Sequence, residues 1–284
     1  MSKLKRIVSV QDISCLGKCS LTVALPIISA MGVECAVVPT AVLSTHTMFR
    51  GYTVRDLTDD INPIINHWRK ENIKYDAVYT GYLGSFEQLN IVGQMFDEYK
   101  NDGALIVVDP VMADNGKLYP GFTEEFAKSM ATICGKADVI VPNLTEASYM
   151  LGVPYVGSDY DEEYIKDMLK KLCGLGCKKA VITGVSFEKG RLGVMAYNAK
   201  TDNYFTYFNT HLPVSYHGTG DIYASAALGA IVRGISIEDS LAIAVDFTLE
   251  CMKKTEADPT HRFYGVNFES ALGYYINRIE KSIN

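Results

Sequence analysis

Short apolar runs that alternate with amphipathic stretches constrain the fold of this 284-residue chain more than any other feature. The runs are rich in Val and Ile and apolar without alternation, as strands covered on both faces are. They lie at Arg6 to Val10, Cys35 to Pro39, Ala77 to Thr80, Leu105 to Asp109, Val139 to Val141 and Lys179 to Thr183. The intervals predict helices at Ser20 to Met31, Asp56 to Lys70, Ser85 to Tyr99, Thr123 to Ile133, Leu144 to Leu151 and Asp161 to Leu172. We therefore expect an α/β fold with a mostly parallel central sheet and helices on both faces.

The pattern changes after Thr183. Two strand-like runs, Arg191 to Tyr197 and Tyr204 to Phe208, flank the turn-forming residues 198–203 and predict a hairpin at an antiparallel edge of the sheet. Three helical stretches follow, at Gly220 to Arg233, Ile237 to Lys254 and Asn267 to Lys281. Because the sequence contains neither an internal repeat nor a linker, we expect residues 1–284 to form a single domain.

Composition narrows the class of partner. The net charge is -6, and no basic run is present, which argues against a protein whose main partner is a nucleic acid. No run of about 18 apolar residues occurs, so we expect a cytoplasmic protein without membrane segments. The CxxxC pairs Cys15/Cys19 and Cys173/Cys177 lack the spacing and the histidines of common zinc sites, so the seven cysteines are expected to be reduced thiols.

A glycine-rich turn at Gly218, Thr219 and Gly220 leads directly into an Ala-rich helix. Backbone N–H groups at such a turn, together with the helix dipole, can hold a triphosphate or a transferring phosphoryl group. Asp221 stands where a substrate hydroxyl loses its proton, which is the position of a general base. The alternative is that Asp221 only caps its helix and the glycines only form a turn.

Polar residues also follow several predicted strands. Asp109 and Asp114 follow the carboxyl end of one predicted strand, where a carboxylate could bind Mg²⁺ or another cation. The alternative is that both residues only form turns. Asn143 and Glu146 have the spacing of a capping box, which explains both residues without any function. Tyr82, between two glycines, could stack on a flat substrate or belong to the core.

Taken together, these segments resemble the pyridoxal kinase family of the ribokinase-like superfamily. The resemblance extends from Val8 to about Ala257 and depends mainly on four motifs. They are DPVM-x-D at 109–114, PN-x-x-E at 142–146, TGYLGS at 80–85 and GTGD at 218–221. It implies a ribokinase-like kinase that transfers a phosphoryl group from ATP to the hydroxymethyl group of pyridoxal, pyridoxine or pyridoxamine, in vitamin B6 salvage.

The resemblance also implies roles for individual residues. Asp221 would be the catalytic base, with Gly218, Thr219 and Gly220 as the anion hole. Asp114, Asn143 and Glu146 would serve the Mg²⁺-nucleotide, Asp109 and Thr183 would lie near a monovalent cation (K⁺ or Na⁺), and Tyr119 would belong to a flap over the nucleotide. The vitamer ring would lie near the end of the first strand, with the substrate contacts Asp12, Thr45, His46, Thr47 and Tyr82. Homodimers are common in the family.

Three residues depart from the family pattern. Asp12 replaces the usual serine after the first strand, which leaves the preferred vitamer open, and Ala113 replaces a glycine. His217 precedes the GTGD turn, where it could be a structural or pocket-wall residue or an acid-base group.

Two alternatives stay open at this stage, and a third is disfavoured. One is a hydroxymethylpyrimidine or hydroxymethylpyrimidine-phosphate kinase, although relatives of that kind often carry Cys at the position of Asp221. Another is a non-catalytic vitamer-binding protein with the same fold. A dehydrogenase is disfavoured, because no GxGxxG follows the first strand.

Overall fold

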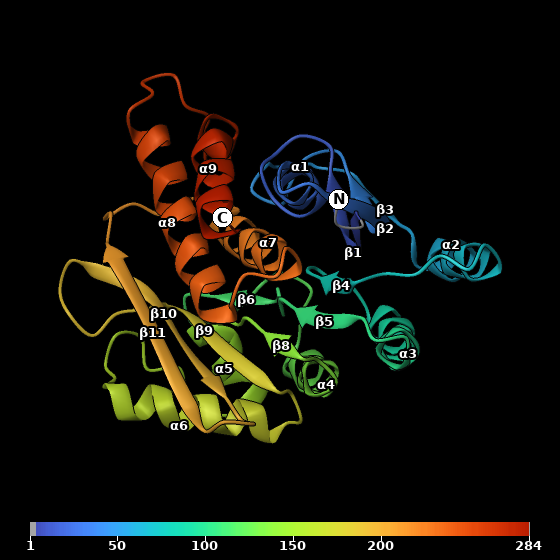
Figure 1. The fold of residues 1–284 in the computed structure, drawn as a ribbon, viewed down its shortest axis with the longest axis horizontal. Coiled ribbons are helices and arrows are strands. Elements are labelled where there is room, and N and C mark those ends of the chain that lie inside the picture. Colours follow the sequence, from blue (N-terminus) through green and yellow to red (C-terminus); the bar gives the residue numbers. More distant parts are fainter. Residues whose placement is uncertain (1–3, 284) are drawn as a thin grey trace. The chain divides into compact units, whose positions relative to one another are not determined.

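The computed structural model describes residues 4–283 of the chain and divides them into two compact units. The first unit comprises the chain up to Ala77 and again from Asn209 onward. The second comprises Val78–Phe208. Figure 1 labels the helices and strands of both units.

The sheet of the first unit has the strand order β1-β2-β3. β1 (Lys5–Ser14) and β2 (Val33–Leu43) are parallel, and β3 (Val54–Asp56) is antiparallel to β2. β1 is buried from Ile7 to Asp12, but it continues four residues beyond the expected end at Val10. Asp12 therefore lies within the strand and not after it.

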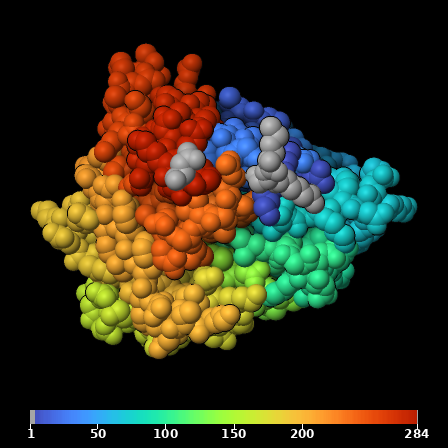
Figure 2. Space-filling view, viewed as in Figure 1, coloured from blue at the N-terminus to red at the C-terminus, as the bar shows by residue number. Residues whose placement is uncertain are grey.

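The helices of the first unit surround a core formed by both ends of the chain. They are α1 (Leu21–Ala30), α2 (Thr58–Lys70), α7 (Thr219–Val232), α8 (Ile237–Glu256), the 3-10 helix η1 (Phe268–Ala271) and α9 (Leu272–Ile283). α7 is apolar on nearly all sides, which is typical of a fully buried helix. Phe247 of α8 stacks on Tyr275 of α9 with ring centroids 4.5 Å apart. The Tyr275 hydroxyl donates a hydrogen bond to the Ala226 carbonyl of α7 at 2.6 Å. In Figure 2 the blue N-terminal and red C-terminal parts of this unit lie against each other.

The sheet of the second unit has the order β11-β10-β9-β8-β5-β4. The strands are β4 (Ala77–Thr80), β5 (Leu105–Val108), β8 (Val139–Ile140), β9 (Lys179–Val185), β10 (Arg191–Asn198) and β11 (Asn203–Thr210). β5, β8 and β9 are parallel, and β10 is antiparallel to β9. The mostly parallel α/β architecture and its antiparallel edge are thus confirmed. The accompanying helices are α3 (Phe86–Asn101), α4 (Glu124–Gly135), α5 (Leu144–Leu151) and α6 (Glu162–Gly174).

Besides the longer β1, the structure differs from the predicted elements elsewhere. β3 was not expected, and Asp56, predicted to begin α2, ends this strand and accepts a hydrogen bond from the Thr58 N–H at 2.8 Å. A two-stranded hairpin, β6 (Ala113–Asp114) and β7 (Lys117–Leu118), occupies a segment predicted as a loop. The predicted last helix begins with the separate turn η1. Among the helices of residues 4–283, none is both long and apolar enough to cross a membrane.

Candidate active site

The glycine turn before α7 has a conformation that its sequence requires. Gly218 is the N-cap of α7 with φ 81°, in the left-handed region, and a Cβ atom there would collide with the carbonyl of Lys18. A Cβ on Gly220, by contrast, would meet no atom within 4 Å. The first N–H groups of α7 have no partner within the helix, so this open turn can accept an anion.

Asp221 lies in the first turn of α7, directly after these glycines. The pKa of its carboxyl group is raised from the ordinary 3.8 to about 7, mainly by burial and to a smaller extent by the negative charge of Asp12, while a hydrogen bond from the Ser20 backbone N–H opposes the increase. A carboxylate with a pKa near neutrality can take up a proton at physiological pH. Asp221 is thus suited to the predicted base.

Asp12 is a buried carboxylate near the carboxyl end of β1, with 4% of its surface exposed. Its Oδ2 accepts a hydrogen bond from the Ser14 hydroxyl at 3.1 Å. Desolvation raises the pKa of Asp12, and hydrogen bonds from the side chains of Ser20 and Ser14 oppose the increase. Asp12 and Asp221 are therefore neighbouring carboxylates that share Ser20 as a hydrogen-bond partner.

The segment after β2 places Thr45, His46 and Thr47 in different environments. His46 is buried; its Nδ1 accepts from the Met48 N–H at 3.2 Å and its Nε2 lies 2.9 Å from the Tyr264 carbonyl. This pattern assigns a neutral ring protonated at Nε2, with both nitrogens used inside the protein. The ring also stacks on His217 at 5.3 Å. His46 is therefore a structural residue of this segment in addition to any contact with substrate.

The two threonines differ in exposure. Thr47 is exposed, whereas the Thr45 hydroxyl is shielded from solvent and has no hydrogen-bond partner among the described residues. A buried hydroxyl without a partner costs free energy unless something else satisfies it. Thr45 is thus the better of the two for a polar contact with a ligand.

In the second unit, Asn143 and Glu146 form the predicted capping box at the start of α5. The Asn143 side chain accepts from the Glu146 N–H, and Glu146 Oε2 accepts from the Asn143 N–H, both at 2.9 Å. The other oxygen, Oε1, accepts from the Met112 N–H at 3.2 Å. Burial raises the pKa of Glu146, with a smaller contribution from the charge of Asp114, whereas these N–H donors stabilise the carboxylate and oppose the increase.

The hairpin that carries Asp114 is held against α5. Asn115 and Gly116 have φ values of 50° and 75°, as a two-residue type I′ hairpin requires. The Gly116 N–H donates to the Thr145 hydroxyl at 3.0 Å, and the Asn143 side-chain amide donates to the Ala113 carbonyl at 2.8 Å. The Asp114 carboxylate is exposed beside this hairpin.

The remaining predicted residues of the second unit lie near the ends of its strands. Thr183 pairs with Asn143 in an isolated parallel bridge, so β9 and the start of α5 are adjacent. Asp109 is buried directly after β5, and its N–H donates to the Thr80 carbonyl at 2.9 Å. The Tyr119 N–H donates to the Met112 carbonyl at 2.8 Å, directly after β7. Tyr82 is half-buried and packs on Phe122 with ring centroids 5.5 Å apart.

The carboxylates Asp109, Asp114 and Glu146 do not form a closed metal site. Within residues 4–283, no three His, Cys, Asp or Glu side chains are grouped closely enough to hold a metal ion. Oxygen donors such as Asp114 nevertheless suit Mg²⁺, which keeps several waters and binds through one or two carboxylates together with substrate phosphates. The exposed carboxylate of Asp114 thus fits a magnesium ion that arrives with a nucleotide.

Sequence reasoning missed Ser14, Ser20 and Lys18. Ser20 precedes α1 and has the sequence pattern of an N-cap, yet its side chain makes no capping hydrogen bond. Instead its hydroxyl forms a hydrogen bond with the Asp12 carboxylate. Its backbone has φ 52° and ψ -136°, a conformation that is rare for a residue other than glycine. No sequence signal reveals this conformation, because it depends on what the segment contacts.

Comparison with known proteins places these features in a family. The model of the family described as phosphomethylpyrimidine kinase matches residues 24–267. A solved structure from Bacteroides thetaiotaomicron, provisionally assigned as a phosphomethylpyrimidine kinase and crystallised with pyridoxal, is 38% identical with a TM-score of 0.89 and covers 96% of both chains. The pyridoxal kinase of Lactobacillus plantarum is 30% identical, with a TM-score of 0.88 over 98% of this chain and 99% of that one. The hydroxymethylpyrimidine/phosphomethylpyrimidine kinase of Bacillus subtilis is 25% identical over 206 residues, 72% of this chain and 71% of its own.

Proposed function

The chain belongs to the phosphomethylpyrimidine kinase family and has a ribokinase-like fold, and from this premise we propose that it is an ATP-dependent pyridoxal kinase. The reaction would phosphorylate the 5′-hydroxymethyl group of pyridoxal, pyridoxine or pyridoxamine, as in vitamin B6 salvage. A protein that is 38% identical was crystallised with pyridoxal, which supports this class of substrate.

The observation that carries the proposal is the position of Asp221 at the glycine turn. Its carboxylate would accept the proton of the substrate hydroxyl as that oxygen bonds to the γ-phosphorus, while the bond from phosphorus to the β,γ-bridging oxygen breaks and ADP leaves. The backbone N–H groups at Gly218, Thr219 and Gly220 would stabilise the negative charge of the transferring phosphoryl group. Because the pKa of Asp221 lies near 7, the group can both receive this proton and return it to solvent.

The second unit would serve the nucleotide. We assign Asp114, Asn143, Glu146 and Thr183 to the ATP side, with Tyr119 in a flap and Asp109 and Thr183 near a monovalent cation. Mg²⁺ bound to the triphosphate neutralises phosphate charge when present. Of these residues, Asp114 offers the exposed carboxylate, whereas both oxygens of Glu146 accept backbone N–H groups, so Glu146 acts mainly by holding Asn143 and Met112 in place.

The proposed vitamer contacts follow the family resemblance. Asp12, Thr45, His46 and Thr47 are the proposed contacts in the first unit, and the Thr45 hydroxyl is supported by its lack of a partner among the described residues. Tyr82 is the proposed aromatic contact in the second. A cytoplasmic homodimer stays a prediction from composition and family resemblance.

Phosphorylation of hydroxymethylpyrimidine is the second candidate function. The family description and a 25% identical relative that carries this activity in its name support it. Asp221 favours pyridoxal, since relatives that act on the pyrimidine often carry Cys at this position. A non-catalytic vitamer-binding protein would have little reason to keep both Asp221 and the glycine turn.

Product analysis tests these candidates. The purified chain is incubated with ATP and Mg²⁺ and, separately, with pyridoxal, pyridoxine, pyridoxamine and hydroxymethylpyrimidine, and the phosphorylated products are identified by mass spectrometry. We expect the B6 vitamers to be converted faster than the pyrimidine, and Asp221→Asn to abolish most of this conversion. Faster conversion of hydroxymethylpyrimidine would reverse the order of the two candidates, and binding without conversion would support the non-catalytic alternative.

A further inference from the structure

The loop between β1 and α1, residues 15–20, contacts the reaction centre of the first unit at several points. The Lys18 carbonyl packs directly on Gly218, and the Ser20 N–H donates to Asp221. From the first turn of α1, the Thr22 hydroxyl lies 2.8 Å from the loop carbonyl of Cys19 and 3.3 Å from that of Gly17 and donates to them. The loop thus lies against both the predicted anion hole and the predicted base.

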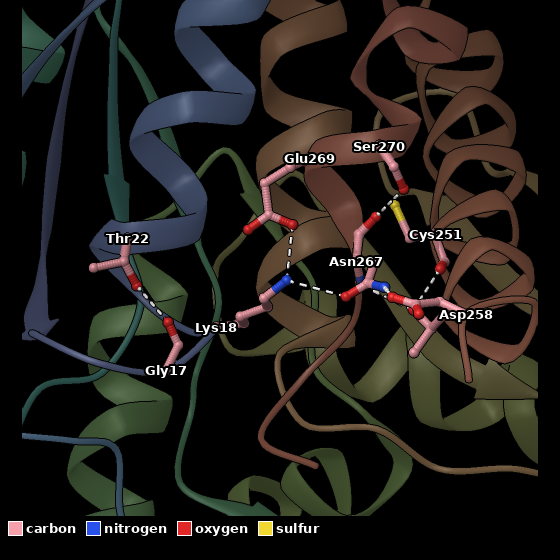
Figure 3. Close-up of polar contacts among 9 residues, drawn as sticks. Gly17, Lys18, Thr22, Cys251, Asp258, Asn267, Glu269 and Ser270 are labelled. Atoms are coloured by element: carbon pink, nitrogen blue, oxygen red, sulfur yellow. Dashed lines mark hydrogen bonds and ion pairs between the residues drawn. The ribbon is translucent and has the colours of Figure 1, made fainter. Parts of the chain in front are cut away.

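The Lys18 side chain anchors this loop to the C-terminal part of the same unit (Figure 3). Its Nζ lies 2.8 Å from Glu269 Oε2 and 3.4 Å from Asn267 Oδ1, and 5.6 Å from the centroid of the Phe268 ring. Only 14% of the side chain is exposed. Its stem packs so closely on Gly265 that a Cβ atom there would lie 2.5 Å from Lys18 Cβ.

The acceptors of Lys18 are themselves held in place. The Asn267 N–H donates to the Thr255 hydroxyl, and its side-chain amide donates to Asp258 Oδ2, both at 2.8 Å. The Ser270 hydroxyl donates to the Asn267 carbonyl at 2.8 Å. Lys18 is therefore fixed at its ammonium group by an ordered network and at its carbonyl by the glycine turn.

Ser20 shows what this anchoring accomplishes. Its φ of 52° and ψ of -136° are unfavourable for a residue with a Cβ atom, and such conformations persist only where the surroundings enforce them. In this conformation its N–H donates a hydrogen bond to Asp221, and its hydroxyl forms a hydrogen bond with Asp12. Relaxation of the backbone would redirect both donors.

We propose that Lys18 is a positioning residue, which acts through its loop to hold the Ser20 N–H and the Gly218 turn in the arrangement that the phosphoryl transfer requires. The proposal rests on the kinase function proposed above, but the anchoring of the loop can be tested without it. In the proposed role, Lys18 itself contacts no reacting atom. It contributes by fixing the conformation of groups that do.

The pH dependence of turnover distinguishes positioning from simple stabilisation. The groups that face Asp221 are the Ser20 N–H, the Asp12 carboxylate of β1 and the thiol of Cys19, and His46 acts on Asp12. Desolvation raises the pKa of Cys19 to about 12, so this thiol stays neutral and Asp12 is the only charge among the groups that act directly on Asp221. Withdrawal of the Ser20 N–H removes the one donor that lowers the pKa of the base, so the acidic limb of the kcat profile should move to higher pH.

The test compares Lys18→Met with Lys18→Arg and with the control Lys5→Met. Methionine keeps an unbranched stem against Gly265 but removes the ammonium group. Lys5 forms an ion pair of similar length with Asp76, 2.7 Å, in the same unit, but on an exposed surface. We expect Lys18→Met to lower kcat about tenfold with KM for ATP within twofold, and to move the acidic limb upward. Arginine should restore most of the turnover, and Lys5→Met should change neither quantity.

Hydrogen exchange supplies a measurement that does not depend on catalysis. Lys18→Met should accelerate amide exchange in residues 216–222 and leave exchange in β2 unchanged. If the wild-type protein phosphorylates no substrate but this local acceleration is found, the kinase proposal fails and the anchoring stands. An unchanged kcat and pH limb in an active, folded Lys18→Met variant would overturn the positioning role, as would a uniform loss of protection that Arg does not restore.

Discussion

The carboxylate of Asp12 raises the pKa of Asp221 beyond the increase that burial causes. The two side chains come from distant parts of the sequence, Asp12 from β1 and Asp221 from α7, and Ser20 hydrogen-bonds to both. Two acidic groups that interact in this way do not ionise independently. The charge of one therefore controls how readily the other acts as a base.

The first prediction concerns the pH dependence of turnover. A general base works in its deprotonated form, so kcat should fall as the pH falls through about 7, the pKa of Asp221. Asp12→Asn removes the repulsive charge and should move this limb to lower pH. Profiles of kcat between pH 5 and 9 for both proteins provide the measurement. A limb near pH 4 in the wild-type protein would mean that Asp221 is not raised as its surroundings indicate.

The second prediction is that Asp221→Asn lowers turnover and raises the free energy of unfolding. Turnover should fall by a factor of about 100 or more while ATP binding stays nearly unchanged, because the base acts in the chemical step. A carboxyl group whose pKa is raised on folding destabilises the folded state as the pH rises from 3.8 through about 7. The neutral amide avoids this cost. Since some solvent reaches the group, we expect a gain of about 2 kcal/mol at pH 8, roughly half of the full linkage value.

Thermal or urea unfolding at pH 8 and pH 4 checks the stability part of this prediction. The gain should largely disappear at pH 4, where the wild-type carboxyl group is protonated in the folded state and close to its ordinary pKa of 3.8 in the unfolded state. Near-normal turnover of the variant would remove Asp221 from the chemistry, whatever the unfolding data show.

The third prediction separates the two glycines of the anion turn. Gly218→Ala should destabilise the fold as well as inactivate the enzyme, because its φ is positive and the new Cβ would collide with the Lys18 carbonyl. Gly220→Ala adds a methyl group in open space at the start of a helix, so stability should be unchanged or rise by up to about 1 kcal/mol. If phosphate approaches the turn closely, the Gly220→Ala variant should still lose turnover at least tenfold.

Melting temperatures measured beside initial rates decide the third prediction. A Gly220→Ala variant that is as stable and as active as the wild type would show that no ligand group approaches this part of the turn. Gly218→Ala cannot serve alone, since the loss of fold would explain the loss of activity.

Much of this fold could be predicted from sequence, because local pattern and burial agree along most elements. The capping box of Asn143 and Glu146 and the antiparallel edge formed by β10 are confirmed, since each depends on residues close together in the chain. The predicted end of β1 was wrong because Asp12 and Ser14 are polar, which suggested a loop, yet both lie buried in the strand. The buried Asp12 carboxylate accepts hydrogen bonds from Ser14 and from Ser20, and only the folded chain brings Ser20 near.

The site residues likewise differ in whether they depend on local sequence or on contacts between distant residues. Asp221 could be predicted, because a glycine turn and a helix start are local signals. Lys18 could not, since its contacts with Asn267 and Glu269 join residues separated by about 250 positions. Single-sequence patterns carry no information on contacts at that separation.

The fourth prediction concerns Glu146→Gln. The carboxylate accepts N–H groups with both oxygens, whereas a glutamine amide offers one acceptor and turns its NH₂ toward the other donor. We expect a loss of about 1 to 3 kcal/mol in unfolding free energy and a several-fold decrease in turnover. Raising Mg²⁺ should restore part of the turnover if Glu146 also serves the metal-nucleotide. Kinetics at several Mg²⁺ concentrations measure this, and a loss that no Mg²⁺ concentration relieves would leave Glu146 with its structural role alone.

The last prediction concerns the choice of vitamer. A carboxylate at Asp12 could accept a hydrogen bond from the 3-hydroxyl or the protonated ring nitrogen, and could attract the cationic aminomethyl group of pyridoxamine. Asp12 is held for such a contact by Ser14, whose hydroxyl donates to Oδ2 at 3.1 Å. The neutral aldehyde of pyridoxal would gain less from the same charge. We therefore expect pyridoxamine or pyridoxine to be used at least as well as pyridoxal.

Asp12→Ser tests this role of the carboxylate, because it restores the neutral hydroxyl usual in the family. A charge-assisted hydrogen bond contributes roughly 1.5 to 3 kcal/mol, so the ratio of kcat/KM values should shift toward pyridoxal about tenfold or more. The substitution also lowers the pKa of Asp221, but that effect acts on all three vitamers alike and cancels in the ratio. Measuring kcat/KM for the three vitamers at a pH above 8, where Asp221 is deprotonated in both proteins, isolates the contact. An unchanged ratio would limit Asp12 to tuning the base and remove it from substrate recognition.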